Sequence, residues 1–159
     1  MLRRSLIAAA AVVALGGAAF ALGTSAFAQD AQFGSAAEAK AMLEKAIAAV
    51  TADKAKALAA FSAGTDGFKD RDLYPFCANA GDGVMTAHPV AALRGTKLQD
   101  IKDKAGKSFG EEMYKVGSKD GVVSEVGYMW TRPGSDAPVE KVSFVTKVGD
   151  QICGVGYYK

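Results

Sequence analysis

The sequence predicts an α+β protein in which an N-terminal helix packs on a five-stranded antiparallel sheet. Residues 35–63 are rich in Ala, Lys and Glu and carry hydrophobic residues at helical spacing. From residue 72 onward, short runs of β-branched and aromatic residues alternate with glycine-containing turns. The Asp82-Gly83 pair between the first two runs is a strong hairpin signal, because such a turn needs a residue with positive φ.

The first 28 residues have the pattern of a secretory signal peptide. Arg3 and Arg4 precede an apolar run from Leu6 to Leu22, and Ala26-Phe27-Ala28 places small residues where a signal peptidase reads them. We expect cleavage after Ala28, so that 29–159 is a periplasmic or secreted single domain. The alternative, a membrane anchor, fits less well because the run is short and interrupted by glycine.

Charge argues against nucleic acid as a partner. Without Arg3 and Arg4, the 19 basic residues of the chain become 17, which equals the number of acidic residues. The expected mature protein is therefore formally neutral, whereas neutralising phosphates requires a clustered cationic surface.

The expected helical segment, 29–63, begins with a capping box formed by Ser35 and Glu38. It is either one bent helix or two consecutive helices, the second starting near Thr51 and Asp53. We expect its hydrophobic stripe to pack on the sheet, although a coiled-coil dimer is the alternative. The stripe comprises Leu43, Ile47, Val50, Leu58 and Phe61.

The sheet core is expected within 72–159. Strands are predicted at 73–79, 84–88, 122–132, 139–148 and 151–158. Between the second and third strands, a short helix is expected near 97–104 and another at 108–116, the latter capped by Ser108.

Cys77 and Cys153 are the only cysteines, and export would place them in an oxidising compartment. If their strands are neighbours, a disulfide would close a loop of about 75 residues and contribute on the order of 4 kcal/mol. The alternative is two buried free thiols. Neither cysteine has a second thiol or histidine at zinc-ligand spacing.

Parity along the strands identifies candidate binding residues. Tyr128 and Trp130 share one face of a strand, and His88 is expected on the same face as Thr86. A lysine directed at a covered face is costly unless an anion meets it. Lys141 is therefore either the counter-charge for a ligand carboxylate or a solvated lysine on the open face.

Motifs for catalysis, metals and cofactors are missing from the sequence. No Gly-x-Ser-x-Gly or other nucleophile–base arrangement surrounds His88, the single histidine. The Gly154-Val155-Gly156 segment has no helix after it, so it is not a dinucleotide loop. Asp66, Asp70 and Asp72 lack the EF-hand pattern and are interpreted as a solvated loop. We expect neither enzymatic activity nor a bound metal or cofactor.

A series of landmarks over about the last ninety residues resembles the single Cache domain, an extracytoplasmic relative of the PAS fold that binds small molecules. The landmarks are Tyr74-Pro75-Phe76, Asp82-Gly83, Ala87-His88-Pro89, Leu93-Arg94-Gly95, Asp103-Lys104-Ala105-Gly106, Tyr128-Met129-Trp130, Lys141-Val142-Ser143-Phe144 and Gly154-Val155-Gly156-Tyr157-Tyr158.

The resemblance implies a PAS-like sheet with a cavity beside the segment that joins its second and third strands. Its first and last strands would be neighbours, which favours the disulfide between Cys77 and Cys153. Two positions depart from the pattern: Pro75, which indicates an edge or a bulge, and Cys77, where relatives carry an aliphatic residue. The ligand-binding residues implied are Tyr74, His88, Arg94, Tyr128, Trp130 and Lys141, with Met113 as a further candidate.

The function implied is reversible binding of a small organic acid as a sensory input. Relatives sit on chemoreceptors or histidine kinases, so this chain is expected to act through a separate membrane receptor or kinase, or as a carrier. The alternatives are a structural adaptor without a ligand, and redox sensing through Cys77 and Cys153. The oligomeric state is left open.

Overall fold

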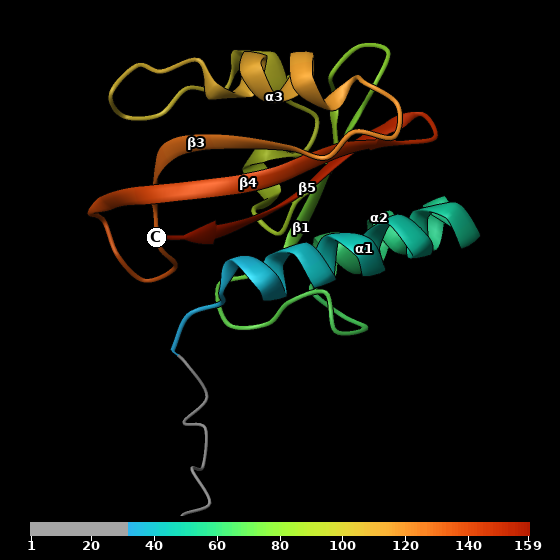
Figure 1. Cartoon of the computed structure of the whole chain (residues 1–159), viewed down its shortest axis with the longest axis horizontal. Helices are drawn as coiled ribbons and strands as arrows, with labels where there is room; N and C mark the ends of the chain where they lie inside the picture. The colour runs from blue at the N-terminus through green and yellow to red at the C-terminus, as the bar shows by residue number, and fades with distance from the viewer. Residues whose placement is uncertain (1–31) are drawn as a thin grey trace, which may run out of the picture.

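The computed structural model describes residues 32–159 as three layers (Figure 1). Helices α1 (Ala36–Ala52) and α2 (Lys54–Ala63) cover one face of a sheet, and α3 (Phe109–Gly117) covers the other. The predicted signal peptide, 1–28, lies outside the described residues. Within 32–159, no helix has the length and apolar character needed to cross a membrane.

The sheet contains five antiparallel strands in the order β2-β1-β5-β4-β3. The α+β prediction and the predicted adjacency of the first and last strands are therefore confirmed. The strands are β1 (Pro75–Asn79), β2 (Met85–Ala87), β3 (Ser124–Thr131), β4 (Pro138–Val148) and β5 (Gln151–Tyr158).

The start of α1 has the predicted capping box. The Ser35 hydroxyl accepts from the Glu38 N–H at 3.3 Å, and the Glu38 carboxylate accepts from the Ser35 N–H at 2.7 Å. Asp53 then ends α1 and caps α2 by accepting from the Lys56 N–H. The segment therefore forms two consecutive helices, and Gly64 ends the second with a left-handed φ of 68°.

The hydrophobic stripe of α1 and α2 packs on the sheet, as predicted. Leu43, Val50 and Phe61 are buried, while Ile47 and Leu58 are partly buried against the same core. This face of the sheet therefore has its own hydrophobic layer, separate from the layer under α3.

The cysteines are joined under these helices, which confirms the predicted disulfide. Cys77 of β1 and Cys153 of β5 are directly opposite each other in the sheet and 76 residues apart in the chain. Both are fully buried, in the core that contains Ala46 and Phe61. The bridge thus lies on the face of the sheet that α1 and α2 cover.

Strand β1 is central rather than at an edge, and Pro75 is tolerated for a different reason. Pro75 is the first residue of β1 and faces Val155 of β5. On its other side β2 ends at Ala87, opposite Cys77, so no strand requires a donor from Pro75. The bulge that the proline indicated lies between Cys77 and Ala78.

The connection from β2 to β3 forms two 3₁₀ turns, η1 (Ala91–Leu93) and η2 (Leu98–Asp100), followed by α3. The helix expected at 97–104 is therefore only η2. Ser108 precedes α3 but its side chain makes no capping bond. The Gly110 N–H, one of the donors at this helix start, instead donates to the Ile101 carbonyl at 3.2 Å, so the preceding loop substitutes for the cap.

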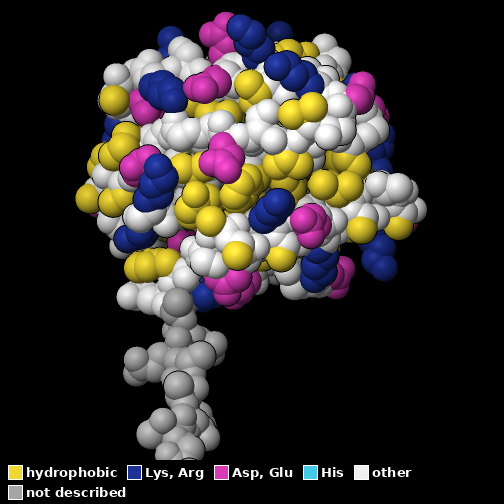
Figure 2. Space-filling model, viewed as in Figure 1, with side chains coloured by type: hydrophobic (Ala, Val, Ile, Leu, Met, Phe, Trp, Pro, Cys, Tyr) yellow, Lys and Arg dark blue, Asp and Glu magenta, His cyan; other side chains and the backbone are white. Residues whose placement is uncertain are grey.

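Figure 2 shows acidic and basic side chains interspersed over the visible face, with hydrophobic side chains between them. This mixture agrees with the balanced charge of 29–159.

Candidate ligand cavity

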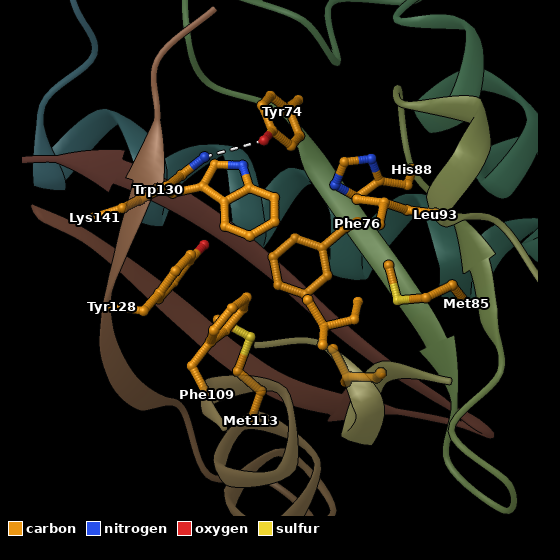
Figure 3. Close-up of a pocket in the computed structure, with 12 residues that line it drawn as sticks. Tyr74, Phe76, Met85, His88, Leu93, Phe109, Met113, Tyr128, Trp130 and Lys141 are labelled. Atoms are coloured by element: carbon orange, nitrogen blue, oxygen red, sulfur yellow. Dashed lines mark hydrogen bonds between the residues drawn. The ribbon is translucent and has the colours of Figure 1, made fainter. Parts of the chain in front are cut away.

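A cavity of about 30 Å³ lies between the sheet and the β2–β3 connection, with α3 as part of its cover (Figure 3). Its lining comes from strands β1, β2, β3 and β4 and residues next to them, from both 3₁₀ turns and from α3. The lining residues are Tyr74, Phe76, Met85, His88, Leu93, Leu98, Ile101, Phe109, Met113, Tyr128, Trp130 and Lys141.

Strand alternation directs most of these side chains. Tyr128 of β3 faces Lys141 of β4 in the register, and Trp130 is two residues beyond Tyr128 on the same face. The parity expected for His88 is wrong. Met85 and His88 both line the cavity, because β2 ends at Ala87 and the chain no longer follows strand geometry at residue 88.

Lys141 places an ammonium group inside this cavity. The residue is only 1% exposed, and its Nζ donates to the Tyr74 hydroxyl at 3.1 Å (Figure 3). Nζ also lies 4.4 Å from the centre of the Tyr74 ring and 4.6 Å from that of Tyr158. Two aromatic faces therefore stabilise the cation, each by up to about 2 kcal/mol when water is excluded.

Burial lowers the pKa of Lys141 to about 7, and the charge of Asp72 opposes this shift. Among the described residues no carboxylate lies within ion-pair distance of Nζ. Asp72 is itself buried, which corrects the solvated loop expected for this residue. Its Oδ1 accepts from the Gly34 N–H at 2.7 Å, while its Oδ2 has no hydrogen-bond partner among the described residues.

Two glycines of β5 provide the space for Lys141 and Phe76. A Cβ at Gly156 would lie 2.5 Å from Lys141 Cε and 2.6 Å from Ser143 Oγ. A Cβ at Gly154 would lie 2.6 Å from Phe76 Cζ. Real Cβ atoms do not approach other atoms this closely, so the closing Gly-x-Gly forms a flat floor under the cavity.

An aromatic wall closes the side formed by β3 and α3. The rings of Phe109 and Tyr128 stack with centroids 4.1 Å apart, and Trp130 meets Phe109 edge-on at 5.5 Å. The Tyr128 hydroxyl is 2.9 Å from Ser143 Oγ, so its polar end is satisfied. Burial is the main reason that the pKa of Tyr128 is raised, and the phenol is neutral at physiological pH.

His88 is a neutral hydrogen-bonding residue on the opposite side. Burial, followed by the charge of Lys141, lowers the pKa of His88 to about 4. Its Nδ1 accepts from the Val90 N–H at 2.9 Å, which assigns the remaining proton to Nε2. No described residue accepts a hydrogen bond from that Nε2–H, so the donor is available to a ligand.

Five of the six residues proposed for ligand binding line the cavity together: Tyr74, His88, Tyr128, Trp130 and Lys141. Met113 lines it as well. The sixth, Arg94, is exposed outside the lining, where its guanidinium donates to the His88 carbonyl at 3.1 Å. The loop geometry after η1 turns Arg94 outward, while its neighbour Leu93 points inward.

Sequence reasoning missed most of the apolar lining, namely Phe76, Met85, Leu93, Leu98, Ile101 and Phe109. Phe76 lies in a predicted strand and Phe109 in a predicted helix, so strand parity and position on the helix could have identified them as lining residues. The residues of the two 3₁₀ turns had no periodic pattern that revealed their direction. Among the described residues, no group of three or more His, Cys, Asp or Glu side chains forms a candidate metal site.

The three-layer fold and a small, largely apolar cavity with a buried cation are those of a small-molecule sensor domain of the PAS-like type. The chain belongs to the single Cache family, because the family model described as Single Cache domain 2 matches residues 25–157. No curated protein sequence matches the chain.

Solved structures of chemotaxis sensor domains are similar to this chain. A methyl-accepting chemotaxis protein from Vibrio parahaemolyticus has a TM-score of 0.60 at 22% identity, covering 77% of this chain and 86% of that one. A periplasmic sensor domain of a chemotaxis protein has 0.56 at 28% identity, covering 77% and 88%. A Cache chemosensory domain described for carboxylic acid recognition has 0.56 at 26% identity, covering 77% and 86%.

Proposed function

We propose that this Cache domain reversibly binds a short organic carboxylate, with Lys141 as the counter-charge. The carrying observation is the buried ammonium, which faces a largely apolar cavity without a carboxylate partner among the described residues. Burying a charge is costly unless an opposite charge and hydrogen bonds meet it. An anionic ligand would supply both.

The remaining donors suit one carboxylate group. Lys141 has donors beyond the one used by Tyr74, and the His88 Nε2–H is available. The alkyl part of the ligand would then pack against Tyr128 and Trp130 on the aromatic wall (Figure 3). Charge-assisted hydrogen bonds contribute about 1.5–3 kcal/mol each, and burial of the alkyl part adds to their sum.

The size of the cavity favours the smallest acids. The cavity volume is only about 30 Å³, so each further carbon of a straight-chain acid requires the cover to move further outward. We therefore expect affinity to fall from acetate or propionate to longer straight-chain acids.

The domain is proposed to work in the periplasm, through a membrane receptor or histidine kinase. Support comes from the similarity to periplasmic and chemosensory domains and from the similar Cache domain described for carboxylic acid recognition. Binding without chemical conversion fits the family, whose members are sensory ligand-binding domains.

The test is calorimetry and thermal shift with acetate, propionate, pyruvate and lactate on the wild type and on Lys141→Met. At least one acid should raise the melting temperature of the wild type, and Lys141→Met should bind it at least about tenfold more weakly. Lys147→Met is the matched control, because Lys147 is on the same strand but pairs with Asp120 at the surface. If no acid binds, the proposed sensor function is wrong and the alternative of a structural domain without a ligand is favoured.

A further inference from the structure

Trp130 is a wall shared by two hollows. It lines the inner cavity, and it also lines an outer hollow of about 210 Å³. The residues around the outer hollow are Lys102, Lys104, Met129, Trp130, Thr131 and Pro138. The indole therefore stands between the surface and the cavity that contains Lys141.

The charge of the outer hollow is one-sided. Lys102 and Lys104 are both exposed, and none of the described residues that line the hollow is acidic. Lys104 Nζ donates to a backbone carbonyl, that of Asp136, at 3.0 Å. Neither lysine forms an ion pair with a described residue, so no carboxylate compensates their charge directly.

Asp103 holds the two lysines in place. Asp103 is not among the residues that line the hollow, and its carboxylate accepts from the Ala105 and Lys107 N–H groups, both at 2.9 Å. It also accepts from the Met129 N–H of β3 at 3.2 Å, which fastens the loop beside Trp130. The acidic residue of the loop is thus used for structure, and its basic neighbours remain at the opening.

Trp130 is held by packing rather than by polar bonds. Its contacts with Phe109 and Tyr128 are edge-on, at 5.5 and 6.1 Å between centroids. The residue is half-buried, and its indole N–H makes no hydrogen bond to a described residue. Rotation of the indole therefore costs packing contacts but breaks no hydrogen bond to a described residue.

We propose that the outer hollow is the access site for the ligand, where Lys102 and Lys104 collect small carboxylates that pass Trp130 to reach Lys141. The inference rests on the proposed function and adds its route. Two exposed cations raise the local concentration of anions and the association rate, while the buried ammonium beyond the indole retains the ligand.

The collecting role can be tested without knowing the ligand, because Trp130 is the single tryptophan of the chain. Iodide should quench its fluorescence, and Lys102→Glu with Lys104→Glu should lower the iodide quenching constant by about two-fold or more at constant ionic strength. Quenching by neutral acrylamide should not change. The control is Lys40→Glu with Lys56→Glu, two exposed lysines on the helices of the opposite face.

The access role is tested by stopped-flow fluorescence with acetate as the probe. The double variant at Lys102 and Lys104 should lower the association rate constant and leave the dissociation rate constant unchanged. Unchanged iodide quenching, or an unchanged association rate, overturns the access site while the binding of acetate still upholds the proposed function. If iodide quenching responds but acetate does not bind, the proposed function fails and the access role fails with it.

Discussion

Lys141 sets the chemistry of the cavity because its ammonium is buried between two tyrosine rings. Its nearest acidic influence is Asp72, which acts through space and makes no ion pair with it. The cation is therefore tolerated in the ligand-free protein but not fully compensated. An anionic ligand can offset the part of the desolvation cost of this charge that the protein leaves uncompensated.

Stability should consequently depend on pH between about 7 and 10.5, the pKa of Lys141 in the folded protein and its ordinary value. The pKa of Lys141 is lowered to about 7 in the folded state, so the unfolded chain binds more protons above pH 7. The free energy of unfolding should rise with pH through this window, by at most about 1.4 kcal/mol per pH unit. Denaturant unfolding of wild type and Lys141→Met measures it.

The same experiment separates Lys141 from its neighbour. His88, whose pKa is lowered to about 4, produces a rise in stability with pH only between about 4 and 6.5. Lys141→Met should remove the upper rise and retain the lower one. An upper rise that persists in Lys141→Met would contradict the assignment.

At the scale of elements, β5 serves both faces of the sheet. Gly154 and Gly156 leave space for Phe76 and Lys141 on the cavity face. Cys153 and Val155 point to the opposite face, toward α1 and α2. The alternation of strand side chains separates these two tasks. A substitution on one face of β5 therefore leaves the contacts of the other face in place.

Gly156→Ala should disable the cavity. The added Cβ would lie 2.5 Å from Lys141 Cε and 2.6 Å from Ser143 Oγ, so the buried lysine would be pushed into the cavity that it lines. We expect a loss of about 1–3 kcal/mol in stability and weaker acetate binding. Gly127→Ala on β3 is the control, because its nearest contact is Val142 Cγ2 at 4.0 Å. Equal effects of both variants on acetate binding would refute the steric explanation.

The disulfide should contribute stability but not ligand affinity. Removing it as Cys77→Ala with Cys153→Ala should cost up to about 4 kcal/mol, because it closes a long loop. Acetate affinity of the folded variant should be unchanged, since the bridge faces Phe61 rather than the cavity. Non-reducing mass mapping of protein from cells should find one fully bridged form. A mixture of bridged and reduced forms would instead favour redox sensing.

At the scale of the whole molecule, the cavity is connected to both ends of the described chain. On one side, Asp72 holds the Gly34 N–H at the start of α1. On the other, Arg132 lies over the rings of Phe33 and Tyr158, 4.1 and 5.2 Å from their centres. Figure 1 shows the start of α1 and the C-terminus at the same end of the domain. Lys141 itself lies against Tyr158 at the C-terminal end, and Asp72 relates it to Gly34 at the start of α1.

Acetate should therefore change the dynamics of the N-terminal end. A carboxylate beside Lys141 competes with Asp72 for the field of the same ammonium, which should weaken the hold of Asp72 on Gly34. Hydrogen exchange at the Gly34 amide should become faster with acetate, while α2 amides stay unchanged. Asp72→Ala should give fast exchange at Gly34 with or without acetate. Exchange in the wild type that acetate does not alter would refute the coupling.

Much of the fold, and most of the polar residues of the cavity, could be predicted from the sequence. Local signals were sufficient for the capping box at Ser35, the break at Asp53 and the Asp82-Gly83 hairpin, because each depends on neighbours in the chain. The outward direction of Arg94 and the burial of Asp72 could not be predicted in this way. Arg94 lies in the 3₁₀ connection, which has no period that reveals the direction of a side chain. Asp72 lies in the loop before β1, and its burial depends on the chain near Gly34, 38 residues away.

The sequence by itself determined the α+β class, the five strands, the parity of β3, and the presence of a lysine that needed an explanation. These properties follow from local propensity and from the two-residue and 3.6-residue periods of strands and helices. Only the tertiary structure decided that Lys141 is enclosed by Tyr74 and Tyr158, that Gly156 makes room for it, and that Trp130 separates it from an outer basic hollow. The reason is physical: burial and desolvation arise from contacts between segments distant in the chain, and the composition of one segment does not contain them.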